Sequence, residues 1–167
     1  MYDLGRTGHT SRVKPADADL PTVHDLDEFA ALVDRAGPDE ELYVRWSEGP
    51  AVDVDQPEQS SRDALTGITL PGLSANLLRV ESWWGNRSTR RWVARRLYDY
   101  RHLREQRGPG VRPWVLVGEQ CGRGPDNEPL VICHRPVAWV SEEALRQCEK
   151  IVREAGSEDW GPLDRTG

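Results

Sequence analysis

Apolar residues recur along the chain at two spacings, and the order of these patterns predicts an α+β fold. Between Asp25 and Gly37 they recur every three or four positions, which is typical of one face of an α-helix. Residues 42–47 alternate with a period of two, as expected for a β-strand. The patterns then continue as helix, strands, helix, strands and helix. We therefore expect a small mixed or antiparallel sheet of about five strands packed by three helices.

Turn residues and the spacing of apolar residues predict where the later helices and strands lie. A basic segment from Asn86 or Ser88 to about Leu103 carries an apolar stripe and predicts the second helix. Residues 111–117 are almost continuously apolar and predict a central strand, followed by a loop at 119–129. Further strands are expected at 130–133 and 137–140, separated by Arg135-Pro136, and a last helix between Ser141 and Gly156.

The distribution of polar residues predicts one domain between two tails. Residues 1–20 are polar without periodicity, which predicts a flexible N-terminal tail. Residues 21–163 are expected to form a single α+β domain, and 164–167 a short C-terminal tail. A chain of 167 residues is the usual length for one domain.

The composition favours a cytoplasmic protein. Hydrophobic residues make up 37% of the chain, and no apolar run approaches the roughly 20 residues that span a bilayer, so we expect no membrane association. No basic and apolar leader starts the chain. The three cysteines lack a C-x-x-C spacing, so we expect a reducing compartment, no metal site and no disulfide framework.

Charge is distributed unevenly along the chain. The net charge is −6, and 20 of the 22 basic residues are arginine. Residues 87–107 contain eight arginines against Asp99 and Glu105, which gives this window a charge of +6 and leaves −12 for the rest. Overall acidity argues against general nucleic-acid coating, whereas the basic window predicts an anionic small molecule or an acidic protein surface as its partner.

Four arginines are candidate ligand-binding residues. At about 100° per residue, Arg91 and Arg95 lie opposite the apolar stripe of the basic helix, whereas Arg96 lies within it. Arg45 lies on the polar face of the strand at 42–47. A guanidinium at any of these positions could hold a carboxylate or phosphate. The structural alternatives are a solvated helix face, a buried ion pair for Arg96, and the wet face of an amphipathic strand for Arg45.

Two further candidates come from a glycine-rich loop and from paired tryptophans. Arg123 lies in the segment 122–129, where glycines would let backbone N–H groups converge on an anion, although an ordinary hairpin loop explains the same residues. Trp83 and Trp84 cannot both face inward on one extended segment, so one of them is expected to be exposed or to line a groove. We take Trp84 as a candidate for stacking on a ligand, with packing at the sheet edge as the alternative.

Nearly the whole chain, about residues 22–163, resembles a family of uncharacterised actinobacterial proteins. The similarity rests on LYVRWS at 42–47, LPGLSAN at 70–76, WWG at 83–85, VARRLYDY at 93–100 and GRGPDNEPLV at 122–131. This resemblance implies a high-GC bacterial host and no assigned activity.

A weaker resemblance concerns ADP-ribosyltransferases of the Arg–Ser–Glu type. Arg45, Ser74 and Glu128 occur in the order in which those enzymes place their arginine, serine and glutamate. The resemblance implies that Arg45 would bind a phosphate of NAD, that Ser74 would support the site, and that Glu128 would hold the ribose hydroxyl. The sequence departs from the family at Ala75, which interrupts the serine motif, and at Pro129, which directly follows the glutamate.

These observations lead to three hypotheses. The first is a small cytoplasmic protein, not an enzyme, without a cofactor, that binds an anionic ligand or an acidic partner through Arg45 and the basic helix. The second is an NAD-dependent ADP-ribosyltransferase-like enzyme with Arg45, Ser74 and Glu128 as catalytic residues. The third is an accessory interaction protein without a small-molecule site.

Overall fold

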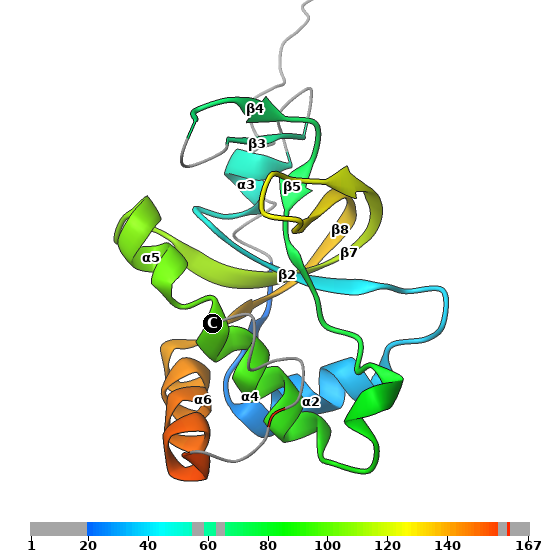
Figure 1. Ribbon diagram of the computed structural model, residues 1–167, viewed down its shortest axis with the longest axis vertical. Coiled ribbons are helices and arrows are strands. Elements are labelled where there is room, and N and C mark those ends of the chain that lie inside the picture. The colour runs from blue at the N-terminus through cyan, green and yellow to red at the C-terminus, as the bar shows by residue number, and fades with distance from the viewer. Residues whose placement is uncertain (1–19, 55–58, 63–65, 157–159, 161–167) are drawn as a thin grey trace, which may run out of the picture.

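The computed structural model describes residues 20–54, 59–62, 66–156 and 160. The predicted tail at 164–167, and all but the last residue of the predicted tail at 1–20, lie outside the described residues. The described part contains a curled sheet with three longer helices gathered on one side of it (Figure 1).

The longer helices and strands occur in the order that the hydrophobic pattern predicts, together with several short elements that it does not predict. The strands are β1 (Thr22–Val23), β2 (Leu42–Ser47), β3 (Ser61–Arg62), β4 (Thr69–Leu70), β5 (Leu73–Ser74), β6 (Asn76–Leu77), β7 (Arg112–Arg123) and β8 (Pro129–Val140). The helices are α2 (Leu26–Arg35), α3 (Pro50–Asp53), α4 (Thr89–Asp99), α5 (His102–Arg107) and α6 (Glu142–Ala155), with a 3₁₀ turn at Ser82–Trp84.

The main sheet is mixed, which confirms the predicted fold class. Its strand order is β1-β8-β7-β2-β6, and β5 pairs with β8 outside this path, so six strands take part. β1 runs parallel to β8, whereas the other pairs in the sheet are antiparallel. The long β7–β8 hairpin forms the centre, and β3 and β4 make a separate small hairpin.

One face of the sheet packs against the helices. Leu42, Val44 and Trp46 of β2 point to this side and join a core that includes residues of α2, α4 and α6. The helices begin where side chains can accept the first free N–H groups, since Asp25 accepts from Glu28 N at 2.8 Å and Ser141 accepts from Ala144 N at 3.1 Å. Both N-terminal caps confirm the sequence prediction.

The other face of β2 is not the wet surface that its alternation predicts. All six residues of β2 are buried, including Arg45 and Ser47. Leu73, Ala75 and Val54 pack on this side with Trp114 of β7, so β5 and the segment after α3 cover the sheet. Figure 1 shows α3 and β5 across the sheet from the three long helices.

The central hairpin is longer than its turn residues suggest. The structure joins the two predicted strands at 130–133 and 137–140 into β8, because shifts in register accommodate Pro136 opposite Leu116. β7 likewise extends to Arg123, so the predicted loop at 119–129 shrinks to the turn between β7 and β8.

The basic segment forms two helices instead of one. Ser88 caps α4 by accepting from Arg91 N, as predicted, but α4 ends at Asp99 and α5 begins at His102. Side chains contact the carbonyls at the break: Arg101 donates to Tyr98 O at 2.6 Å, and His102 Nδ1 lies 3.0 Å from Asp99 O. Neither a glycine nor a proline marks this break, which explains why the sequence pattern did not show it.

Candidate functional site

Arg45 is part of a buried ion pair. Its Nε lies 2.6 Å from Asp53 Oδ2, and the two side chains are 6% and 8% exposed. Its Nη1 donates to the backbone carbonyl of Ser74 at 2.8 Å. The charge of Arg45 is therefore balanced inside the fold, by a carboxylate from the short helix α3, and its guanidinium is a weaker candidate for an anionic ligand than the sequence suggested.

A polar network continues from this pair through Ser47. The Ser47 hydroxyl donates to Asp53 and accepts the indole N–H of Trp114 at 2.8 Å and the backbone N–H of Gly49 at 3.1 Å. Each of these groups is buried and has a hydrogen-bond partner, as buried polar groups require. The network fastens α3 to the sheet.

The three residues of the transferase hypothesis are gathered in one region. Arg45 contacts Ser74 O, and Ser74 is paired with Leu130 in the β5–β8 ladder, two residues beyond Glu128. The carboxylate of Glu128, however, folds back and accepts from Asp126 N at 2.9 Å within the hairpin turn. The arrangement thus brings the residues near one another, with Arg45 already neutralised by Asp53 and Glu128 engaged in its own turn.

The candidates on α4 also contact the rest of the protein. Arg96 donates from Nε and Nη2 to Leu77 O, at 3.2 and 2.9 Å, and so covers the outer carbonyl of edge strand β6. Arg95 pairs with Asp99 at 2.8 Å. The guanidinium carbons of Arg91 and Arg95 lie 4.8 and 5.4 Å from the ring centre of Trp160.

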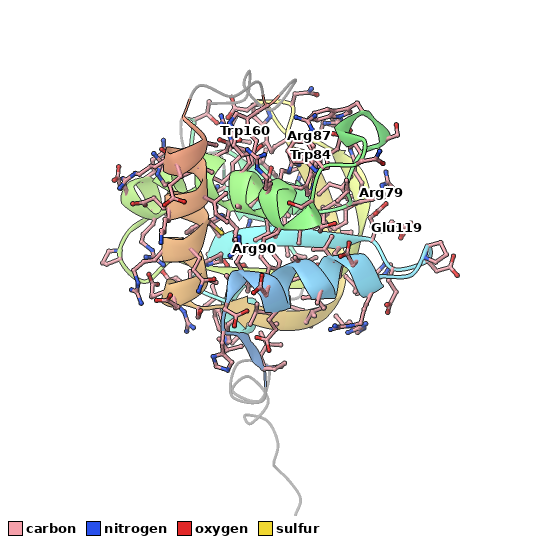
Figure 2. All side chains as sticks on the ribbon, turned by 90° about the horizontal axis from the view of Figure 1, so that it is seen from below. Arg79, Trp84, Arg87, Arg90, Glu119 and Trp160 are labelled. Atoms are coloured by element: carbon pink, nitrogen blue, oxygen red, sulfur yellow. The ribbon has the colours of Figure 1, made fainter. Side chains whose placement is uncertain are left out.

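Trp84 is a core residue and does not line a groove. It is 1% exposed, and its ring stacks on Trp160 with centroids 6.0 Å apart. Arg87 lies over the Trp84 ring at 3.9 Å, and Figure 2 shows these three side chains close together beside α4. Of the tryptophan pair, Trp83 is the more exposed residue.

Many arginines of this chain bind backbone carbonyls. Arg123, the hairpin candidate, donates to Asn127 O at 2.6 Å and so stabilises its own turn. The same kind of contact joins Arg107 to Trp46 O, Arg104 to Val111 O, Arg87 to Trp84 O and Arg62 to Gly67 O. A guanidinium with five N–H groups can satisfy carbonyls that irregular segments leave unpaired, so much of the arginine content serves the fold.

A cleft of about 150 Å³ opens between the α4–α5 corner and α6. Trp46, Leu97 and Cys148, each at most 2% exposed, lie beneath its floor, and the half-buried Tyr98 and Leu145 line it nearer to solvent. Its outer wall carries Arg101 and Arg146, which are exposed, together with Arg104 and the two carboxylates Glu142 and Glu149. The cleft therefore combines apolar side chains with a charged mouth, and it is smaller than most small-molecule sites.

The charges at the mouth of the cleft differ in how they are paired. Arg104 binds both carboxylate oxygens of Glu142, at 3.0 and 2.7 Å, and this hydrogen-bonded pair holds the pKa of Glu142 below its usual range. Arg146 pairs with Glu143 at 2.8 Å. Arg101 lies 3.5 Å from the ring centre of Tyr98 and makes no ion pair with a carboxylate among the described residues.

Cys148 contributes an apolar surface and not a nucleophile. Burial raises the pKa of its thiol to about 12, so the thiolate needed for nucleophilic attack is scarce at neutral pH. The cysteine lies on the buried side of α6, as its position in the apolar stripe predicts.

Sequence reasoning identified the basic helix but missed this cleft. Arg101 and Arg104 belong to the basic window, whereas Trp46 and Arg146 were not considered as site residues. The cleft forms only because α4, α5 and α6 pack beside one another, and no local pattern specifies that packing. A signal that could have helped is the cluster of arginines at the end of the basic window, where the apolar stripe runs out.

Two other features are missing from the described ranges. Among these residues no group of three or more histidine, cysteine, aspartate or glutamate side chains is arranged to hold a metal ion. Within the same part of the chain, no helix is both long and apolar enough to cross a membrane.

Comparisons with known proteins point to one family. Neither the curated proteins nor the solved structures contain a significant match to this chain. A model for a family of unknown function, DUF6098, matches residues 16–161, which is most of the sequence. The chain therefore belongs to this family of unknown function, DUF6098.

Proposed function

We propose that this protein binds a small organic anion in the cleft between the α4–α5 corner and α6. The observation that carries the proposal is Arg101, an exposed guanidinium at the mouth without a carboxylate partner among the described residues. The half-buried side chains of Tyr98 and Leu145 line the same cleft. An anion can therefore pair with Arg101 while its apolar part leaves water.

The size of the cleft sets the size of the ligand. A cavity of about 150 Å³ is large enough for a benzene-sized molecule. A single aromatic ring or a short aliphatic chain with one carboxylate meets both the volume and the polarity of the walls. A ligand this small has few atoms with which to gain binding energy, so we expect affinities in the micromolar to millimolar range.

An acidic protein surface is less well supported as the partner. The outward-facing arginines of α4 and α5 that it would meet are engaged with the protein's own acids, as in the Arg90–Asp27 and Arg104–Glu142 pairs. A new partner would have to compete with these contacts, and exposed ion pairs contribute little net energy. The cleft offers what the helix surface does not, a concave site beside a guanidinium without such a pair.

The transferase hypothesis keeps one supporting observation, the approach of Arg45, Ser74 and Glu128 to one another. It requires Arg45 to leave Asp53 before it can bind a cofactor phosphate. Separating a buried pair is expensive, so a binding function at the cleft agrees better with the contacts of these residues.

The proposal is tested by calorimetric titration of the full chain with benzoate. We expect millimolar benzoate to bind, and Arg101→Gln to weaken binding roughly tenfold, because a charge-assisted hydrogen bond is lost. Arg90→Gln is the matched control, since Arg90 lies in the first turn of α4, away from the cleft, and pairs with Asp27 of α2 (Figure 2). Absence of benzoate binding to the wild-type chain, or equal weakening in both variants, would overturn the proposal.

A further inference from the structure

Arg101 contacts Tyr98 in two ways. Its guanidinium carbon lies 3.5 Å from the centre of the Tyr98 ring, which is close enough for the two flat groups to lie face to face. Its Nη1 donates to the backbone carbonyl of the same residue at 2.6 Å. An exposed arginine side chain otherwise samples many rotamers, so two contacts at the guanidinium itself restrict where this charge lies.

The end of α4 makes both contacts possible. Tyr98 lies in the last turn of α4, and Arg101 lies in the break before α5. The last carbonyls of a helix have no partner further along it and are commonly satisfied by side chains or by tighter turns. Tyr98 O accepts in both ways, from the backbone N–H of Arg101 at 3.3 Å and from its side chain. The break therefore places ring, carbonyl and guanidinium together.

The hydrogen bond to Tyr98 leaves one edge of the guanidinium open. Nη1 of Arg101 is engaged, whereas Nε and Nη2 make no hydrogen bond with any other described residue. These two nitrogens form the side of the guanidinium that presents two parallel N–H groups, the arrangement that binds both oxygens of a carboxylate. The residue is exposed and lines the cleft, so a ligand there can reach this edge.

The acidic side chains at the mouth of the cleft have other partners. Glu142 binds Arg104 through both carboxylate oxygens, and Glu149 pairs with Arg153 at 2.9 Å. Within the described part of the chain, neither carboxylate forms an ion pair with Arg101. The open edge of Arg101 is therefore available to a carboxylate that a ligand brings.

We propose that Tyr98 is a positioning residue for Arg101, and that the Nε and Nη2 edge held in this way binds the carboxylate of the ligand through two hydrogen bonds. This inference rests on the proposed function, because it concerns the same arginine and the same ligand. It narrows the anion to one that offers two oxygens side by side, as a carboxylate does. A positive charge at this position is then not sufficient, because the shape and orientation of the guanidinium also matter.

Variants at Tyr98 test the positioning role, with benzoate binding to the full chain followed by chemical-shift titration. Tyr98→Leu removes the ring but leaves the backbone carbonyl, so we expect binding to weaken only partly, by roughly three- to fivefold. Tyr98→Phe keeps the ring and should recover most of that loss. In an Arg101→Gln background, Tyr98→Leu should have little further effect, because the ring acts through the arginine.

Arg101→Lys tests the contact through two hydrogen bonds. A lysine side chain keeps the positive charge but has no pair of parallel N–H groups in a rigid plane. We expect benzoate to bind Arg101→Lys several-fold more weakly than the wild-type chain. If Arg101→Lys binds benzoate as tightly as wild type, charge alone is sufficient and the proposed geometry is wrong.

One resonance reports on the arrangement without any ligand. The Nε–H signal that Arg101→Gln removes from the ¹H–¹⁵N spectrum should lie at unusually high field, because the guanidinium lies over the Tyr98 ring, and should move to an ordinary position in Tyr98→Leu. If the signal does not move, or if Tyr98→Leu binds benzoate as tightly as wild type, this inference fails while the proposed function stands.

Two further outcomes are also decisive. If Tyr98→Leu weakens binding equally with and without the Arg101 guanidinium, the ring touches the ligand directly and the positioning role is wrong. If benzoate does not bind the wild-type chain, the proposed function fails, and this inference fails with it.

Discussion

The guanidinium of Arg45 lies 2.6 Å from the carboxylate of Asp53, in a pair of which less than a tenth of either side chain is exposed. The two residues are eight positions apart, yet they join the middle of β2 to the end of α3. The pair therefore fixes α3 against β2, on the face of the sheet opposite the long helices. The strand pattern predicted Arg45 as a ligand-binding residue, but its guanidinium is instead used in this structural ion pair.

Removal of the Asp53 carboxylate should therefore destabilise the protein strongly. We expect Asp53→Ala to lower the free energy of unfolding by about 3–5 kcal/mol, because Arg45 would be left as a buried charge without a partner. Urea unfolding followed by circular dichroism measures this. The double variant Arg45→Met/Asp53→Leu should recover part of the loss, since it removes both charges. A cost below about 1 kcal/mol for Asp53→Ala would show that the pair is not buried in solution.

NAD should not stabilise the wild-type chain. A ligand that binds only the folded state raises the melting temperature, and the rise grows with the logarithm of the ligand concentration once that exceeds Kd. Because Arg45 is already paired with Asp53, we expect no change in melting temperature with millimolar NAD in a thermal shift assay. A clear rise that Glu128→Gln abolishes would instead favour the transferase hypothesis and count against a structural role for Arg45.

The N-terminal caps and apolar faces of the helices could be predicted from the sequence, because they depend on residues within one or two helical turns. Asp25, Ser88 and Ser141 each begin a helix as their positions predict. The short helix α3 is missing from the predicted elements, although it has a local signal, since Pro50 occupies its first turn.

The contacts of the arginines could not be predicted in the same way. Arg96 binds the backbone carbonyl of Leu77, 19 residues away, and a carbonyl is present at every position, so no residue type marks the partner. The cleft could not be predicted from the sequence either, because Trp46 and Arg101 come to the same cleft only after the sheet and helices have packed. The charge map marks the segment that forms α4 and α5, but it could not show that many of these arginines contact carbonyls and carboxylates of the protein itself.

Acid should weaken the link between α5 and α6 at the mouth of the cleft. The hydrogen bonds from Arg104 lower the pKa of Glu142 in the folded state. A carboxylate with a depressed pKa stabilises the fold above its unfolded pKa of about 4.3, and this contribution is lost as the pH falls through the folded value. The melting temperature of wild type should thus exceed that of Glu142→Gln at neutral pH, with a difference that narrows in acid. In an Arg104→Gln background, Glu142→Gln should have little effect on the melting temperature. If Glu142→Gln lowers the melting temperature by the same amount in that background, the hydrogen bonds from Arg104 are not the cause.

The three cysteines should differ in reactivity according to their burial. Cys121 is exposed, whereas burial raises the pKa values of Cys133 and Cys148 to about 12. Thiol reagents react with the thiolate, so at pH 8 we expect one rapidly labelled thiol in the folded chain and three after denaturation. Cys121→Ser should abolish the rapid phase. Rapid labelling of a second thiol would show that one of the buried sites opens readily.

The unpaired indole of Trp46 makes a prediction about stability that does not depend on any ligand. Trp46→Phe and Trp92→Phe both shorten a buried indole in the same core and leave a small cavity, so the packing loss is similar in the two variants. Only Trp92→Phe also deprives a buried acceptor, Leu78 O, of its donor. We therefore expect Trp92→Phe to be more destabilising by about 1–3 kcal/mol in urea unfolding without added ligand. If Trp46→Phe is equally costly, its N–H has an acceptor in the free protein.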